Sequence, residues 1–446
     1  MSKIINNNII IIALSLFACK LWANCPNCNV VIIAIDALQA KRVSSLGYFR
    51  KTTPTIDKFA SEGVSFSQAI SPSSWTIPTY LSVFSSSYPS EHRMTNRYRK
   101  FEKDEKILAN FSKDTPELQV MAELFKNEGY RTGAFTGASG ISAELGYNKG
   151  FDVFKDEGPF GGIEKSAEGA VKWLKGLNKG EKFFLFLHGY DSHGQYTLPQ
   201  DYKGKFMQVS KKFKGTKEEE LALREAKVQG KSTNIDYGDK EFWSAWYDSK
   251  IYDADQRLGK FLETFQEMPQ SANTIFILFS DHGTEIFEHG AIDHGHTLYD
   301  ELILVPFIWK GPGIKKNSIV KEQVSTIDIL PTLLDFMSFK VSKSLKFQMR
   351  GRSLKKALSG KKIKSMDAYS ETDYRDLVHK RSVRTSDGWK YIITLDDGSE
   401  ELYDINIDPQ EKKNLSQVNK EKVKTLMSVL DKHLDAMAPT RKATRK

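Results

Sequence analysis

Short runs of consecutive hydrophobic residues recur along the chain, and polar residues follow each run directly. The clearest runs cover Asn29–Ile35, 183–187 and 275–279. Runs of this length that are rich in branched side chains are typical of strands buried on both faces of a sheet. Segments with hydrophobic residues at helical spacing lie between them, for example over 167–177 and 243–265. This alternation predicts an α/β fold with a doubly wound, mainly parallel sheet and helices on both faces.

Capping signals add further elements to this framework. Thr53-Pro54 and Gly63 delimit a helix over 54–62, because proline is favoured at the first helical position and glycine just after the last. The same kinds of signal predict helices over 78–84 and 116–128 and strands over 64–66, 131–135 and 305–309.

The pattern changes near residue 345. Short alternating segments separated by Asp-Gly turns predict antiparallel strands over 382–384, 389–394 and 401–403, with a helix over 421–434 to cover them. We therefore expect a main domain over 29–340, a small C-terminal α+β subdomain over 345–436 and a disordered basic tail over 437–446.

A lysine-rich stretch over 200–240 interrupts the alternation and has little periodicity. We interpret it as an insertion on the active-site side of the main domain. Two readings stay open at this point, a lid over the site and a solvated loop without a role.

The first residues have the layout of a secretory signal peptide. Lys3 precedes a hydrophobic run over 9–17, and small residues lead to Ala23. The run is too short for a comfortable transmembrane helix, so we expect residues 1–23 to be a signal peptide and the mature chain to be periplasmic or secreted, without a transmembrane helix. Residues 16–19 also loosely resemble a lipobox, which leaves a lipoprotein attached through Cys19 as an alternative.

Three cysteines limit the available chemistry. Cys25 and Cys28 could close a local disulfide in an oxidising compartment. No cysteine follows Cys28, which excludes a cysteine nucleophile and a disulfide framework from the main domain.

The length and charge of the chain fit a large enzyme with an anionic partner. The 446 residues exceed one typical domain. The net charge of +9 suits an anionic substrate. No nucleic-acid-binding motif accompanies this charge, so we expect no nucleic-acid partner.

Histidines and carboxylates cluster where buried strands end. Four of the nine histidines lie between residues 282 and 296, directly after the strand that ends before Asp281-His282. Asp36 follows the strand Asn29–Ile35 in the same way. Parallel strands bring such residues to one edge of a sheet, where α/β folds bind ligands. Asp and His favour zinc or manganese, with calcium possible, so the sequence predicts a site for one or two divalent metal ions.

Two further segments carry candidate residues. Thr76 lies just ahead of the helix predicted to begin at Pro78, where backbone N–H groups favour an oxyanion. A plain role as helix N-cap is equally open for Thr76. Asp191 and His193 follow the strand over 183–187 and form another Asp/His pair at a strand end.

Taken in order, these motifs resemble the sulfatase branch of the alkaline phosphatase superfamily. The resemblance runs from about residue 29 to 434 and includes the C-terminal segments around 383–415. It implies hydrolysis or transfer at a phosphate or sulfate ester. It also implies roles by position: metal ligands Asp36, Thr76, Asp281 and His282; catalytic residues Thr76, His193 and His294; ester-binding residues His193 and His294; and a possible second metal site of Asp191, His193 and His294.

The chain departs from this family at the nucleophile. Sulfatases have a Cys-x-Pro-Ser-Arg motif whose cysteine becomes formylglycine, whereas this chain has Thr76-Ile77-Pro78-Thr79-Tyr80. Threonine does not undergo that maturation, so no formylglycine is expected. The leading hypothesis is an exported, metal-dependent, sulfatase-like hydrolase in which metal-ligated Thr76 forms a covalent threonine ester.

Two alternatives remain beside the hydrolase. The segment Ser192-His193-Gly194-Gln195-Tyr196 is similar to a motif of phosphoethanolamine and phosphoglycerol transferases, which suggests transfer of a head group to an envelope lipid or glycan. Ala37 and Tyr80, which replace family residues, suggest a non-catalytic binder of sulfated or phosphorylated polymers. His289 is expected to be structural, and the sequence assigns no role to His296.

Overall fold

The structure is a computed structural model that describes residues 24–443 except 103–104 and 229–233. The predicted signal peptide over 1–23 and the lipoprotein alternative at Cys19 therefore lie outside the described residues. Among the described residues, no helix is long and apolar enough to cross a membrane.

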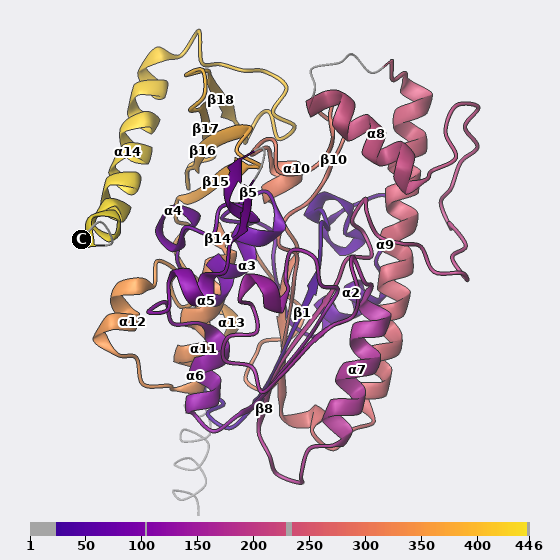
Figure 1. Cartoon of the computed structure of the whole chain (residues 1–446), viewed down its shortest axis with the longest axis vertical. Coiled ribbons are helices and arrows are strands. Elements are labelled where there is room, and N and C mark those ends of the chain that lie inside the picture. Colours follow the sequence, from indigo (N-terminus) through magenta and orange to yellow (C-terminus); the bar gives the residue numbers. More distant parts are fainter. Residues whose placement is uncertain (1–23, 103–104, 229–233, 444–446) are drawn as a thin grey trace, which may run out of the picture.

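An eight-stranded sheet forms the centre of the molecule (Figure 1), with strand order β13-β2-β12-β9-β1-β8-β6-β7. The central strand β1 pairs in parallel with β8 and β9, and β12 alone runs antiparallel to both of its neighbours. The sheet is therefore mainly parallel, as predicted. Its strands are β1 Asn29–Ile35, β2 Val64–Phe66, β6 Arg131–Thr136, β7 Val153–Asp156, β8 Phe183–Gly189, β9 Thr274–Phe279, β12 Phe307–Lys310 and β13 Ser318–Val320.

Helices cover both faces of this sheet. One hydrophobic cluster joins alternate side chains of β1, β8 and β9 to α2 Pro54–Ser61, α7 Ile163–Lys175 and α9 Tyr237–Gln266. The other cluster joins the opposite side chains to α3 Thr76–Ser85, α6 Met121–Asn127 and α11 Ile329–Met337. Burial of side chains on both faces explains why these strands read as continuous hydrophobic runs.

Two helix starts differ from their predicted positions. Helix α3 begins at Thr76, two residues earlier than expected. The helix predicted from residue 116 begins only at Met121, because Thr115 instead ends the short helix α5 Phe111–Asp114. The side chain of Glu123 accepts from the Val120 N–H and stabilises the actual start of α6.

A second, antiparallel sheet lies at the C-terminal end of the chain. It has the order β15-β16-β17-β18, and α14 packs on it through Val423, Leu426 and Leu430. Helix α14 extends to Ala443, so most of the predicted disordered tail is helical. The elements are β15 Ala368–Tyr374, β16 Val378–Arg384, β17 Trp389–Thr394, β18 Glu400–Asp404 and α14 Lys420–Ala443.

A buried ion cluster joins this second sheet to the main body. Lys390 of β17 has no exposed surface. Its ammonium group lies 2.9 Å from an oxygen of Asp300 and 2.7 Å from an oxygen of Glu411. Asp300 begins α10 Asp300–Ile303 of the main domain, so the C-terminal sheet is fixed to the segment that follows the histidine-rich loop.

The remaining elements are short. The helices are α4 Pro89–His92, α8 Lys217–Val228, α12 Lys343–Gln348 and α13 Lys355–Leu358, with single 3-10 turns at Ala40–Arg42, Ser44–Leu46, Ala143–Leu145, Ser271–Asn273 and Thr326–Asp328. The strand pairs are β3 Ala69–Ile70 with β14 Val324–Ser325, β4 Tyr98–Glu102 with β5 Glu105–Leu108, and β10 Glu285–Ile286 with β11 Ile292–Asp293.

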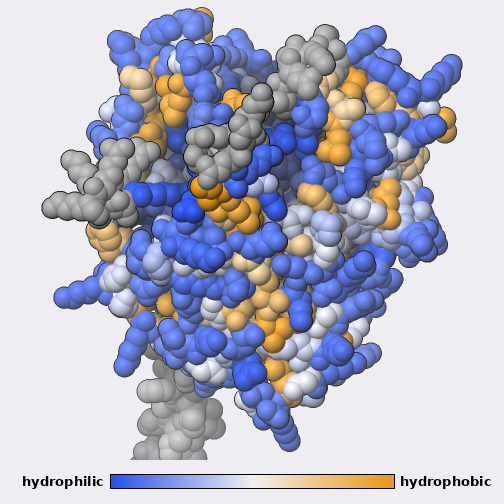
Figure 2. Space-filling model, viewed as in Figure 1, coloured by the Kyte–Doolittle hydropathy of each residue, from blue (hydrophilic) through white to orange (hydrophobic). Residues whose placement is uncertain are grey.

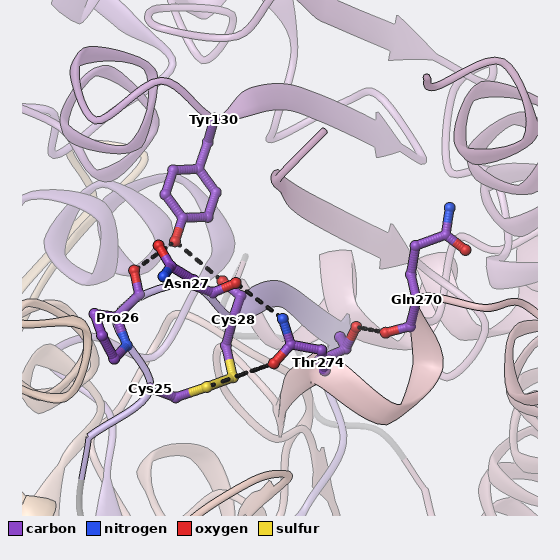
Figure 3. Close-up of a disulfide and its surroundings, with 8 residues drawn as sticks. Cys25, Pro26, Asn27, Cys28, Tyr130, Gln270 and Thr274 are labelled. Atoms are coloured by element: carbon purple, nitrogen blue, oxygen red, sulfur yellow. Dashed lines mark hydrogen bonds between the residues drawn. A yellow bond between two sulfur atoms is a disulfide. The ribbon is translucent and has the colours of Figure 1, made fainter. Parts of the chain in front are cut away.

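A disulfide lies just before the first strand of the sheet. It links Cys25 and Cys28, as the sequence allowed. The Tyr130 hydroxyl lies 3.4 Å from the Pro26 carbonyl oxygen and 3.1 Å from that of Cys28, and it donates to both (Figure 3). The surface in the same view as Figure 1 is mostly hydrophilic, with hydrophobic residues in separate small spots (Figure 2).

Candidate functional site

The register of two parallel strands brings two carboxylates together. Ala34 of β1 pairs with Phe279 of β9, and Asp36 and Asp281 each follow two residues later. Both side chains are fully buried. The Ala37 N–H donates to Asp281 Oδ1 at 3.2 Å, which directs the other carboxylate oxygen toward Asp36.

Asp36, Asp281 and His282 form a group whose potential ligand atoms lie within 4.8 Å of one another. Asp36 Oδ1 and Asp281 Oδ2 are buried and have no hydrogen-bond partner among the described residues. His282 Nδ1 donates to the Gly283 carbonyl at 2.6 Å, which leaves the lone pair of Nε2 facing the two carboxylates. The group therefore contains three buried acceptors and no donor.

This donor set fits a divalent cation. Unpartnered buried carboxylates are unfavourable by themselves, and burial together with Asp281 raises the pKa of Asp36 well above its usual value. Oxygen and imidazole ligands suit zinc or manganese. Asp36, Asp281 and His282 are thus the residues that could hold the ion.

Thr76 lies directly beside this group as the first residue of α3. Its side-chain oxygen lies 3.2 Å from Asp36 Oδ2 and 3.3 Å from His282 Nε2. A β-carbon at Gly140 would lie 2.7 Å from Thr76 Cγ2, so only glycine fits there. The structure therefore brings together all four residues expected around the first metal. Their burial also means that the Thr76 hydroxyl is held in one place.

Tyr80 occupies the place of the family's arginine and points into the core. It is fully buried, and its ring lies edge-on to His188 with 5.2 Å between the centroids. Its side chain adds no positive charge to the site.

A second group lies next to the first. His193, Asp293 and His294 also have potential ligand atoms within 4.8 Å of one another. The two Nε2 atoms of His193 and His294 are 2.9 Å apart, and the rings of His282 and His294 lie 4.3 Å apart between centroids. Burial lowers the pKa of both His193 and His294 well below the usual value.

Asp191 does not join this group, contrary to its predicted place in a second metal site. Its Oδ2 accepts from the Ile163 N–H at 2.7 Å, at the N-terminus of α7. Asp293 lies in its place beside His294. Asp293 immediately precedes His294 in the sequence, and this adjacency was the signal that could have identified it.

The lysine-rich stretch is only partly a solvated loop. It contains α8, whose Glu220 and Arg224 are one helical turn apart and both buried. Glu220 packs on Gly194, where an added β-carbon would lie 2.3 Å from Oε1. Arg224 forms an ion pair with Asp293 at 3.0 Å. Sequence reasoning missed both residues because the stretch as a whole is polar.

Other histidines have structural partners. His188 Nε2 lies 3.4 Å from Asp36 Oδ2. His296 Nε2 lies 2.9 Å from Glu285 Oε2, which gives this residue a carboxylate partner that the sequence did not show. His289 bonds to Glu301 and stacks on Tyr299, consistent with a structural role.

A cavity of about 700 Å³ opens above the two groups. Thr76, His193 and His294 line it, together with residues from the β4–β5 hairpin, α8 and the β15–β16 turn. Its charged lining residues are Arg97, Lys106, Arg224, Arg375 and Asp376. Four cations against one carboxylate make this cavity suitable for an anionic ligand.

Comparison with known proteins gives a consistent result. The family described as Sulfatase matches residues 28–339, and the family described as N-sulphoglucosamine sulphohydrolase, C-terminal, matches residues 287–440. A sulfatase of Formosa agariphila is 26% identical over 86% of this chain and 82% of that protein. A Delta 4,5-hexuronate-2-O-sulfatase of Bacteroides thetaiotaomicron is 32% identical, but over only 36% of this chain and 34% of that protein.

Among solved structures, a 2-O GAG sulfatase superposes with a TM-score of 0.74. The superposition covers 94% of each chain at 22% sequence identity. At this identity the likeness shows a shared fold.

Proposed function

Because the chain belongs to the sulfatase family of ester hydrolases, we propose that it cleaves a sulfate or phosphate ester with Thr76 as the nucleophile. The observation that carries the proposal is the position of the Thr76 hydroxyl, held between Asp36 and His282 at the floor of a cationic cavity. Family membership supports ester hydrolysis, and this geometry supports the choice of nucleophile.

A divalent ion held by Asp36, Asp281 and His282 would supply positive charge that lowers the pKa of a neighbouring hydroxyl and neutralises the ester oxygens. We favour zinc or manganese because His282 presents a nitrogen ligand. A second ion at His193, Asp293 and His294 would take the lone pair of His193 Nε2, so it is an alternative to a hydrogen bond donated by that atom.

The chain's own residues orient the attack. The Thr76 hydroxyl donates to Asp36 Oδ2, so this carboxylate accepts the proton that Thr76 loses. The Thr76 oxygen then bonds to sulfur or phosphorus while the bond to the leaving alcohol breaks. The product is a covalent threonine ester on the first residue of α3.

His193 and His294 line the same cavity as Thr76, where they can contact the departing oxygen. The Gln195 N–H donates to His193 Nδ1 at 3.1 Å. A neutral His193 therefore carries its hydrogen on Nε2, which faces His294 and the cavity. This N–H can donate a hydrogen bond to the leaving oxygen, which takes its proton from water. Water next attacks the threonine ester, releases sulfate or phosphate and restores Thr76.

The substrate is proposed to be an anionic ester on a glycan or lipid, met outside the cytoplasm. The cationic lining supports the anionic ester, and the Cys25–Cys28 disulfide supports export because such bonds persist in oxidising compartments.

The test is a comparison of Thr76→Ala and Thr76→Ser with the wild type on aryl sulfates, phosphate monoesters and diesters, with zinc, manganese or calcium added. We expect Thr76→Ala to lose about a thousandfold or more in kcat, because no other residue supplies the nucleophile. Thr76→Ser should retain measurable turnover and accumulate a covalent adduct that mass spectrometry locates on residue 76. Thr264→Ala, which removes a hydroxyl bonded within α9, is the control.

Wild-type rates in Thr76→Ala would refute the threonine nucleophile. Absence of any turnover in the wild type would instead favour a binder of anionic polymers. Product analysis with envelope extract separates the third possibility, because a transferase would deliver the group to an acceptor hydroxyl rather than to water.

A further inference from the structure

Two arginines from different parts of the chain lie side by side in the wall of the cavity. Arg224 belongs to α8, and Arg375 lies in the turn after β15. Both bond to the same oxygen of Glu225, Arg224 through Nη2 at 2.8 Å and Arg375 through Nη1 at 3.3 Å. Glu225 therefore holds two guanidinium groups next to each other, and both line the cavity.

Arg224 is buried but still has an unused donor. Only 9% of the residue is exposed. Nη1 bonds to Asp293 at 3.0 Å and Nη2 to Glu225, whereas Nε has no hydrogen-bond partner among the described residues. Nε itself is enclosed by the protein, but Nη1 and Nη2 each carry a second hydrogen. Because Arg224 lines the cavity, these N–H groups are suited to an acceptor brought by a ligand.

The location of Arg224 separates it from the reacting group. Asp293 stands between them, with one oxygen 3.0 Å from Arg224 and the other 3.2 Å from His294 Nε2. The His294 ring in turn lies 4.3 Å between centroids from that of His282, which lies beside Thr76. Arg224 is thus displaced by a layer of side chains from the ester that Thr76 would attack.

We propose that Arg224 and Arg375 form a subsite for a second anionic group, so that the substrate is an ester whose leaving portion itself carries a carboxylate or sulfate. The inference rests on the proposed function for the identity of the first group. A planar guanidinium with free N–H donors matches the oxygens of either anion. Glu225 acts as a positioning residue that keeps the two cations together.

The experiment compares para-nitrophenyl sulfate with the same aryl sulfate carrying a ring carboxylate or sulfonate; the corresponding phosphates replace them if only phosphates are cleaved. We expect the wild type to show a KM about tenfold lower for the doubly anionic esters, the size expected for one charge-assisted contact. Arg224→Ala should remove this preference, and Arg224→Lys should restore part of it. Loss of KM discrimination is a readout that a purely structural role would not give.

Arg375→Gln tests the same subsite if substitution of the buried Arg224 unfolds the protein, because Arg375 is exposed. It is expected to lose part of the preference without loss of stability. Lys217→Ala removes an exposed charge from the same helix and should behave as wild type.

Binding of the same esters to the Thr76→Ala protein, measured by calorimetry, separates the two proposals. Tighter binding of the doubly anionic ester that disappears with Arg224→Ala supports the subsite even if the wild type shows no turnover. Turnover with equal KM for singly and doubly anionic esters overturns the subsite and leaves the hydrolase standing. A preference that survives both Arg224→Ala and Arg375→Gln also overturns it.

Discussion

At the scale of single residues, the unusual feature is a set of buried acceptors with no donor. Asp36 Oδ1 and Asp281 Oδ2 find no partner among the described residues, and His282 adds a third lone pair. The two carboxylates and the imidazole lone pair repel one another unless a cation lies between them. Folding and metal binding are therefore expected to be coupled at this point.

Removal of the metal should destabilise the protein as well as inactivate it. A ligand present at a hundred times its Kd adds about 3 kcal/mol to the free energy of unfolding, so a chelator should lower Tm by several degrees. Elemental analysis of the purified protein gives the metal and its stoichiometry. Asp281→Asn should lose the ion, whereas Asp191→Asn, whose carboxylate lies outside the group, should keep it. An unchanged Tm after verified metal removal would contradict this coupling, and full activity would contradict a role of the ion in catalysis.

At the scale of elements, α3 carries Thr76 and is tied to α4 by one histidine. His92 Nε2 lies 2.9 Å from Ser82 Oγ, and the Met94 N–H donates to its Nδ1. Burial lowers the pKa of His92 from 6.5 to about 3. Between these values the unfolded chain binds a proton that His92 excludes in the folded protein, so the contribution of His92 to stability is complete above pH 6.5 and is lost as pH falls toward 3.

His92 is therefore expected to contribute a slope of about 1.4 kcal/mol per pH unit to the unfolding free energy below pH 6. Chemical denaturation at several pH values measures the slope. His92→Gln should be less stable at neutral pH but should lose this share of the pH dependence. Thr425→Ala, which removes a non-titrating hydroxyl bonded within α14, should leave the slope unchanged. An identical slope in His92→Gln and the wild type would contradict the assignment.

Predictability from sequence also differs by element. β1, β8 and β9 were predictable because burial on both faces leaves a continuous hydrophobic run, and Asp36 and Asp281 follow from the ends of those strands. The start of α6 was not predictable from the sequence. Thr115-Pro116 has the composition of a helix start, but Thr115 ends the preceding helix α5. Arg224 and Arg375 could not be predicted at the site, because their position depends on how α8 and the second sheet pack.

At the scale of the whole molecule, Lys390 joins the two sheets through Asp300 and Glu411. Lys390→Met would leave the buried Glu411 carboxylate without its cation, whereas Asp300 keeps its ion pair with Arg384. Loss of one partner from a buried pair costs about 3–5 kcal/mol. Urea denaturation should show this loss. The matched control is Lys424→Met in α14, which packs on the same sheet and whose partner Glu421 is exposed, with an expected loss of about 1 kcal/mol or less. Equal losses in the free energy of unfolding would show that the buried cluster stabilises the protein no more than an exposed ion pair does.

The disulfide before β1 affects how the protein can be produced. Its ring spans only Cys25 to Cys28, so it restricts the unfolded chain less than a bond closing a long loop would. The Tyr130 hydroxyl holds the same turn through its carbonyl groups without any covalent bond. Chains made in a reducing cytosol should therefore reach the same fold with two free thiols. The number of free thiols in a purified molecule would then show whether it folded in an oxidising or a reducing compartment. It would not show whether the molecule had folded.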